Sequence, residues 1–255
     1  MFAAAFTAGM INSIAGGGTL ITFPVLIWLG LDAKVANATS TVALWPGLMG
    51  GVWGYRREIG RRRPLLLRLG VTSVIGGAIG AELLILTPVG TFAHLVPYLI
   101  LFATLLFMAQ DQITRGLHLQ TTVPDFNQGP LARQKSWWTG AILFQFLSAI
   151  YGGYFGAGNG ILMLAALGLL GINDIHQANG IKNFLGLTLN SAAIIGFAVS
   201  HLVAWPDALV MALGAIVGGY YGAHLARRMG QIIVRRAVII IGLTIGIVML
   251  LRIGE

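Results

Sequence analysis

The chain has 255 residues, of which 56% are hydrophobic and 9% are charged, and its mean hydropathy is +0.83. This composition excludes a soluble globular domain, in which about a quarter of the residues are charged. The formal net charge of +8 does not indicate nucleic-acid binding, because the arginines form short clusters between apolar segments instead of a continuous basic stripe. We therefore expect a polytopic membrane protein with about eight to ten helical segments.

The chain contains no cysteine, which excludes disulfides, thiolate metal sites and a thiol-based relay of a substrate. The histidines lie apart and show no metal-ligand spacing, so we expect neither a metal nor another cofactor. The first residues carry no charged leader, so we expect no cleavable signal peptide.

Two apolar pieces open the chain, residues 2–14 and 19–30, each too short to cross a bilayer comfortably, with the glycine run 15–18 between them. A helix that is broken inside lipid must satisfy its free backbone groups against protein or a wet cavity. We therefore expect the two pieces to form a re-entrant hairpin. Three full spans are expected next, at 35–55, 64–86 and 88–110.

Residues 111–136 form the only long polar connection, and their turn formers predict a cytoplasmic linker between two halves, 1–110 and 137–255. The second half opens like the first, with a broken pair at 137–153 and 160–171. Three more spans are expected, at 175–200, 206–225 and 232–251.

The two halves match in sequence at a constant shift of 142 positions, without a gap. The matched pairs include Gly16 with Gly158, Gly18 with Gly160, Asp32 with Asp174 and Asn37 with Asn179. A single register over about seventy positions indicates an internal duplication.

Charge predicts the orientation of the halves. Arginine-rich segments are expected to face the cytoplasm, which places residues 56–63, the linker and residues 227–236 inside. Asp32 then enters its span from outside, and its counterpart Asp174 enters from the cytoplasm. The predicted fold is therefore all-α, with two inverted repeats that each contain a re-entrant pair and about three spans.

The two glycine breaks are the strongest candidates for a binding site. Helices that start near Gly18 and Gly160 would present free N–H groups and the positive end of a helix dipole to the middle of the membrane, which favours an anion. Glycines also let a ligand approach the backbone closely. The alternative is that these glycines serve only tight helix packing, the role we assign to Gly76-Gly77 and Gly218-Gly219.

Polar residues continue along one helical face of the next span. They are Asn179, Lys182, Asn183, Gly186 and Asn190. A lysine well inside a span costs about 2.5 to 3.5 kcal/mol, so we expect a compensating partner for Lys182. Alternatively, its side chain snorkels toward the cytoplasmic interface. Its counterpart in the first half is Ser40.

The repeat register also pairs Glu82 with His224, which could together carry a coupling proton. Both lie near the ends of their spans, where a charge costs little, so a structural role is the alternative. Tryptophans beside prolines, such as Trp45 before Pro46, are interpreted mostly as interface anchors and helix bends.

Several of these residues carry a family resemblance. The segments 12–24 (NSIAGGGTLITFP) and 35–40 (VANATS) resemble the first signature of the sulfite/sulfonate exporter family, the TauE/SafE-type permeases. The segment 171–183 is similar to its second signature. The resemblance covers nearly the whole chain. It implies a multi-pass carrier of the bacterial inner membrane that moves sulfite, sulfoacetate or similar sulfonates, generally outward. It does not identify the anion, and a homodimer is one possible oligomeric state.

Transferred residue by residue, the resemblance implies one anion site that draws on both halves. The site residues are Gly16, Gly17, Gly18, Asn37, Ser40, Gly158, Asn159, Gly160, Asn179, Lys182 and Asn183. Backbone N–H groups and amides would hold the anion, Lys182 would offset its charge, and access would alternate between the two sides.

Two other classes of protein share this kind of architecture. A membrane-embedded phosphatase needs a base or nucleophile with acidic partners, and no paired carboxylates lie near either glycine run, so we expect no enzyme. A passive anion channel, or a carrier for a different small anion, stays open as an alternative.

Overall fold

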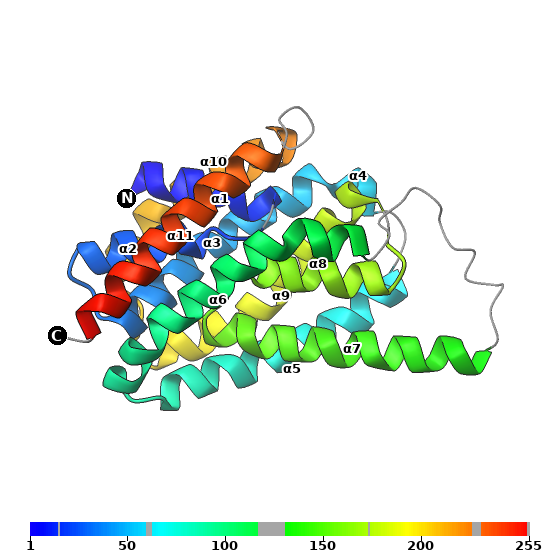
Figure 1. The fold of residues 1–255 in the computed structure, drawn as a ribbon, viewed down its shortest axis with the longest axis horizontal. Coiled ribbons are helices and arrows are strands. Elements are labelled where there is room, and N and C mark those ends of the chain that lie inside the picture. The colour runs from blue at the N-terminus through cyan, green and yellow to red at the C-terminus, as the bar shows by residue number, and fades with distance from the viewer. Residues whose placement is uncertain (15, 60–62, 117–130, 173, 226–230, 254–255) are drawn as a thin grey trace.

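The computed structural model describes residues 1–14, 16–59, 63–116, 131–172, 174–225 and 231–253, and all regular elements in these ranges are helices (Figure 1). The all-α prediction is confirmed. The first half contains α1 (Phe2–Ile14), α2 (Thr19–Trp28), α3 (Ala33–Gly54), α4 (Arg56–Ile59), α5 (Arg63–Leu86) and α6 (Val89–Gly116). The second half contains α7 (Leu131–Tyr154), α8 (Asn159–Leu169), α9 (Ile175–Val199), α10 (Trp205–Leu225) and α11 (Gln231–Ile253).

Three described helical segments are long and apolar enough to cross a membrane, namely Pro64–Leu86, Val89–Gln110 and Ile175–Val199. Shorter apolar helices occur at Thr19–Trp28, Asn159–Leu169 and Val238–Leu251. Together with the hydropathy of the chain, they make this a polytopic membrane protein.

The expected linker is shorter than its polar composition predicts. α6 continues to Gly116 and α7 already begins at Leu131, so both ends of the segment 111–136 are helical. The remainder, 117–130, lies outside the described residues. Polar residues such as Arg133 and Lys135 are good helix formers, so a helix can continue through them beyond its apolar part. α7 therefore has 24 residues and is about 36 Å long at 1.5 Å per residue.

The two broken pairs meet in the interior of the bundle. α2 packs against α1 and α8 packs against α7. In Figure 1, the first pair begins at the N-terminus on the left, where α2 (blue) also ends. The second pair begins with α7 (green) at the far right, so the two pairs start from opposite ends of the bundle. A Cβ placed on Gly16 would overlap the Cα of Gly160, so the backbones of the two breaks touch.

The helices of the two halves exchange partners. α1 packs against α10 and α7 against α5, while α3 packs against α10 and α9 against α5. Backbone contacts follow the same register, because a Cβ on Gly77 would meet the Leu189 oxygen and one on Gly219 would meet the Gly47 oxygen. These four residues form two pairs related by the 142-residue shift. The packing role predicted for Gly77 and Gly219 agrees with these contacts.

Trp45 does not act as an interface anchor. Its Nε1 donates to the Leu187 oxygen at 3.1 Å and to Ser191 Oγ at 3.0 Å, so the ring links α3 to α9. An indole N–H inside a membrane protein needs such a partner, and the crossing of α3 and α9 supplies it. Trp53 and Trp205 are 61% and 48% exposed, as expected for rings that face the surroundings.

Candidate functional site

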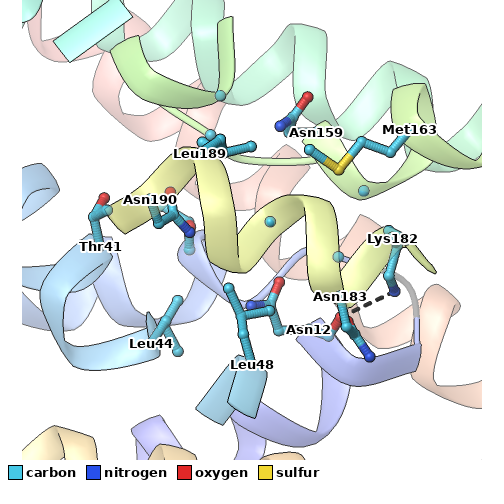
Figure 2. Close-up of a pocket in the computed structure, with 16 residues that line it drawn as sticks. Asn12, Thr41, Leu44, Leu48, Asn159, Met163, Lys182, Asn183, Leu189 and Asn190 are labelled. Carbon is cyan, nitrogen blue, oxygen red and sulfur yellow. Dashed lines mark hydrogen bonds between the residues drawn. The ribbon is translucent and has the colours of Figure 1, made fainter. Parts of the chain in front are cut away.

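A cavity of about 50 Å³ lies where the two breaks meet α3 and α9 (Figure 2). It is lined by Asn12, Gly16, Thr19, Thr41, Leu44, Leu48, Gly152, Gly156, Asn159, Gly160, Met163, Lys182, Asn183, Gly186, Leu189 and Asn190. A volume of this size holds about three to five water molecules or one small ion.

Lys182 carries the only ionisable side chain among the described residues that line the cavity, and none of them is Asp or Glu. The other polar lining side chains belong to asparagine and threonine, whose amide and hydroxyl groups can donate hydrogen bonds. Such a wall favours an anion over a cation, because a cation would meet the ammonium group without a balancing carboxylate.

Lys182 is held by the end of α1. Its side chain is 3% exposed, and Nζ donates to the Asn12 oxygen at 3.1 Å and to the Ser13 oxygen at 3.2 Å. Figure 2 shows the lysine reaching from α9 (yellow) toward this end of α1 (blue). Carbonyls in the last turn of a helix have no partner inside it and lie at the negative end of the helix dipole. The snorkelling interpretation is therefore wrong, because the ammonium group lies inside the protein.

An ammonium group has three donors, and the hydrogen bonds of Lys182 to described residues use two of them. Lys182 lines the cavity, so the third donor, which has no partner among the described residues, can bind a ligand there. The lysine thus combines an anchored position with one free hydrogen bond and a positive charge.

Two asparagines complete the polar wall. Asn183 is fully buried, its Nδ2 lies 3.5 Å from the Ser13 oxygen, and its Oδ1 has no partner among the described residues. Asn159 opens α8, and its Oδ1 accepts a hydrogen bond of 2.6 Å from Ser148 Oγ. The N–H of Gly160, in the first turn of α8, donates to no described residue.

Local sequence signals position these groups. Asp174 caps α9, because its side chain accepts from the Gln177 N–H at 2.7 Å, and this cap sets where the polar face of the helix begins. Gly158 precedes α8 with φ of 71° and Gly16 precedes α2 with φ of 79°, a backbone conformation that favours glycine.

Five of the predicted site residues line the cavity, namely Gly16, Asn159, Gly160, Lys182 and Asn183. Six do not, namely Gly17, Gly18, Asn37, Ser40, Gly158 and Asn179. Gly186 and Asn190 also line the cavity, as their shared helical face with Lys182 predicts.

The remaining break glycines pack against protein. A Cβ on Gly17 would overlap the ring of Phe107, one on Gly18 would lie 2.6 Å from the Ala8 oxygen, and one on Gly158 would lie 3.3 Å from Ala103 Cα. The packing alternative is thus the better description of these three glycines.

Polar residues of α3 make contacts within the protein. Asn37 Nδ2 donates to the Tyr154 oxygen at 3.0 Å, and the Ser40 hydroxyl is bonded to that of Thr22. Asn179, the counterpart of Asn37, is 1% exposed, and in the part of the chain that the structure describes neither its Oδ1 nor its Nδ2 has a partner.

Three polar lining residues were not predicted as site residues: Asn12, Thr19 and Thr41. Asn12 had a usable signal, because it is a polar side chain inside an otherwise apolar segment next to a glycine break. The threonines had none, since threonine is common in helices that pack in membranes.

Of the two residues predicted to carry a coupling proton, the structure describes only the side chain of Glu82. Glu82 is exposed on α5, and the side chain of His224 lies outside the described residues. In the part of the chain that the structure describes, no three His, Cys, Asp or Glu side chains are grouped as a metal site would require.

Comparison with known sequences bears on this arrangement. The family model described as "Sulfite exporter TauE/SafE" matches residues 1–249. The chain belongs to this family. The resemblance seen in the two signatures is therefore confirmed over nearly the whole length.

Relatives within the TauE/SafE family carry transporter names. A "Probable membrane transporter protein" of Haemophilus influenzae (strain Rd) is 28% identical over 245 residues, which cover 94% of this chain and 89% of the relative. "Probable membrane transporter protein YfcA" of Escherichia coli K12 is 26% identical, with coverages of 94% and 85%. "Probable membrane transporter protein ORF9" of Sinorhizobium sp is 26% identical, with coverages of 97% and 90%. No solved structure matches the chain.

Proposed function

We propose that this TauE/SafE family member is a secondary transporter that exports small sulfur-containing oxyanions, such as sulfite or organosulfonates, across the bacterial inner membrane. The observation that supports it best is the buried ammonium group of Lys182, which among the described lining residues is the only charge on a cavity wall of amides, hydroxyls and apolar groups. A buried cation without a carboxylate partner is best balanced by an anion.

The donors of the cavity suit an oxyanion. Lys182 has a donor to spare, the Gly160 N–H is free of described partners, and the amides of Asn12, Asn159 and Asn190 line the same space. Hydrogen bonds to ionised groups are roughly twice as strong as neutral ones, so several convergent donors favour a charged oxygen. The volume of about 50 Å³ favours the smallest members of the class, such as sulfite.

A carrier explains the geometry better than an open channel. The backbones of Gly16 and Gly160 touch beside the cavity, so the two breaks leave no gap between them at this point. The exchange of packing partners supports inverted repeats around a central site, the arrangement in which alternating access operates. A passive channel would require the two breaks to be apart whenever ions pass. A carrier for another small anion would use the same hydrogen-bond donors, so it stays an alternative for the substrate.

Orientation and coupling are part of the proposal. The arginine-rich segment 56–63 and the linker face the cytoplasm, in line with the positive-inside rule. Glu82 and His224 are candidates for a coupling proton. The substrate and membrane lipid are the proposed partners, with no nucleic acid, no enzymatic step and a homodimer as one oligomeric form.

The test is thermal unfolding of purified protein in detergent, with sulfite, sulfate, thiosulfate, sulfoacetate, taurine or chloride. A ligand at a hundredfold excess over Kd stabilises the folded state by about 2.7 kcal/mol. We expect sulfite or a sulfonate to raise the Tm of the parent protein and of Lys34→Met but not of Lys182→Met. Lys34 is a matched control, because it is 6% exposed, bonded to the oxygens of Ile85 and Thr87 at the end of α5, and not part of the cavity lining. A shift that persists in Lys182→Met would contradict the proposal.

Transport by proteoliposomes separates the carrier from the channel. External sulfite should accelerate the efflux of labelled sulfite from loaded vesicles, because a carrier with bound substrate reorients faster than an empty one. The flux should also saturate with concentration, because each carrier has a limited number of binding sites. Flux that rises linearly with concentration and shows no counterflow would indicate the channel.

A further inference from the structure

Beyond the cavity, the polar face of α9 continues toward the end of the bundle where α4 lies. Asn179 lies one turn before Asn183, is 1% exposed, and has no hydrogen-bond partner for Oδ1 or Nδ2 among the described residues. Ser13, at the end of α1, is 2% exposed, and its Oγ also lacks a partner in the described part of the chain. Each buried polar group left unsatisfied costs about 1 to 3 kcal/mol, so such groups normally meet water or a ligand.

These side chains lie around one point next to the cavity. A Cβ on Gly51 would lie 2.7 Å from Asn183 Nδ2 and 3.1 Å from Ser13 Oγ, so the hydroxyl and the amide face the same glycine. Lys182 Nζ lies 3.2 Å from the Ser13 oxygen, which joins this cluster to the cavity. Asn179 extends it by one turn along the same helical face.

Among the described residues, the equivalent positions of the other repeat carry groups with different contacts. The counterpart of Asn179 is Asn37, whose Nδ2 is bonded to the Tyr154 oxygen. The counterpart of Ser13 is Phe155, which packs edge to face against Phe23 with ring centroids 5.6 Å apart. Among the described residues, Asn37 lacks a partner only for Oδ1, whereas Ser13 Oγ and both polar side-chain atoms of Asn179 lack one, so more unsatisfied groups lie on the side of the cavity toward α4.

The route is covered at that end by the junction of α3 and α4. A Cβ on Gly180, the neighbour of Asn179, would lie 2.7 Å from Ile59 Cγ1 and 3.0 Å from Tyr55 Cβ. Tyr55 is fully buried and Ile59 is 8% exposed, whereas Arg56 and Arg57 between them are exposed. The short helix α4 thus places two apolar side chains on α9 and two cations at the surface.

We infer that Ser13, Asn179 and Asn183 form a second, hydrated oxyanion subsite between the central cavity and the arginine-rich end of the bundle, and that Tyr55 and Ile59 close it. An anion leaving Lys182 would meet hydroxyl and amide donors there, and the arginines of α4 would attract it at the exit. This inference rests on the proposed function for the identity of the ligand, but the hydrated route itself does not.

The absence of cysteine from the sequence allows a direct test by single-cysteine labelling. Ser13→Cys and Asn179→Cys would be treated with a membrane-impermeant, sulfonate-bearing methanethiosulfonate reagent, in inverted and in right-side-out vesicles. Asn37→Cys, at the repeat counterpart of Asn179, is the matched control. We expect both test positions to react about tenfold faster than the control, and only in inverted vesicles, because thiol reactivity follows exposure.

A second variant tests the closing residues. Ile59→Ala removes part of the cover over Gly180, so the reaction of Asn179→Cys should become faster while that of Asn37→Cys stays unchanged. Equal reaction at Asn179 and Asn37, or reaction of both test positions from the outside only, would overturn the inference. Folding is checked for each variant by size-exclusion elution, and Ser13→Cys gives an independent reading if Asn179→Cys does not fold.

The two proposals can fail separately. Sulfite binding in the thermal assay without inside labelling would overturn the second subsite and leave the transporter assignment standing. Inside labelling without a thermal shift for any anion would overturn the substrate class and leave the hydrated route standing.

Discussion

Trp45 Nε1 donates to the oxygen of Leu187 at 3.1 Å, and the two residues lie 142 positions apart, so each is the other's counterpart in the repeat. The contact therefore joins equivalent positions of the two halves. Leu44 and Leu48, from the same stretch of α3, line the cavity together with Leu189 of α9. The cavity thus lies beside this contact, between helices of both halves.

Trp45→Phe should destabilise the protein by about 0.5 to 1.5 kcal/mol, because it removes the indole N–H that links α3 to α9 and preserves an aromatic ring. Trp205→Phe is the control, since Trp205 is 48% exposed. Thermal unfolding in detergent measures both. Equal Tm values for the two variants would mean that the link between counterparts contributes nothing measurable.

Gly16→Ala should abolish sulfite transport, because its Cβ would overlap Gly160 and push the two breaks apart. Gly30→Ala separates this effect from backbone strain. Gly30 has a φ of 89°, close to the 79° of Gly16, yet no atom lies within 4 Å of its Cβ position. In both variants, an alanine in the left-handed backbone conformation costs about 1 to 2 kcal/mol. Full transport in Gly16→Ala, or equal loss in both, would argue against a tight approach at the breaks.

Asn183→Asp should weaken anion binding by at least about tenfold, because a carboxylate beside Lys182 would pair with its ammonium group and repel the ligand. Gln145→Glu is a matched isosteric control: Gln145 is also fully buried, bonds Ser73, and is not part of the cavity lining. Titration calorimetry with sulfite compares the affinities. An unchanged Kd in Asn183→Asp would place the anion elsewhere.

Lys34→Met should lower the Tm without changing the affinity for the anion. Lys34 Nζ donates to the Ile85 oxygen at 2.9 Å and to the Thr87 oxygen at 2.7 Å, at the end of α5. Losing a charged donor from buried carbonyls costs about 1 to 3 kcal/mol. Calorimetry of unfolding with and without sulfite measures both quantities. A reduced affinity would mean that Lys34 communicates with the cavity and cannot serve as its control.

Most helix positions were predictable from the sequence, because apolar runs bounded by charge and glycine determine them locally. The span expected at 35–55 is α3 (Ala33–Gly54), and that expected at 64–86 is α5 (Arg63–Leu86). The ends of α6 and α7 were predicted less well. Their terminal turns are polar, and hydropathy does not distinguish a polar helix from a polar loop.

The sequence by itself determined that the chain is a membrane protein, that its two halves share one register, and that each is broken by glycines. These properties follow from local composition and from residue identities at a constant spacing. It also placed Lys182 and Asn183 on one polar face of α9.

Only the tertiary structure decided what covers that face. Lys182 meets carbonyls of Asn12 and Ser13, 170 and 169 positions away, whereas Asn37 turns to Tyr154 and Ser40 to Thr22. Helical periodicity determines which residues share a face, but the neighbour that packs on it depends on the exchange of helices between the halves. In the described part of the chain, the same exchange leaves both polar side-chain atoms of Asn179 without a partner, whereas Nδ2 of its counterpart Asn37 has one, so two related helices line the centre of the protein in different ways.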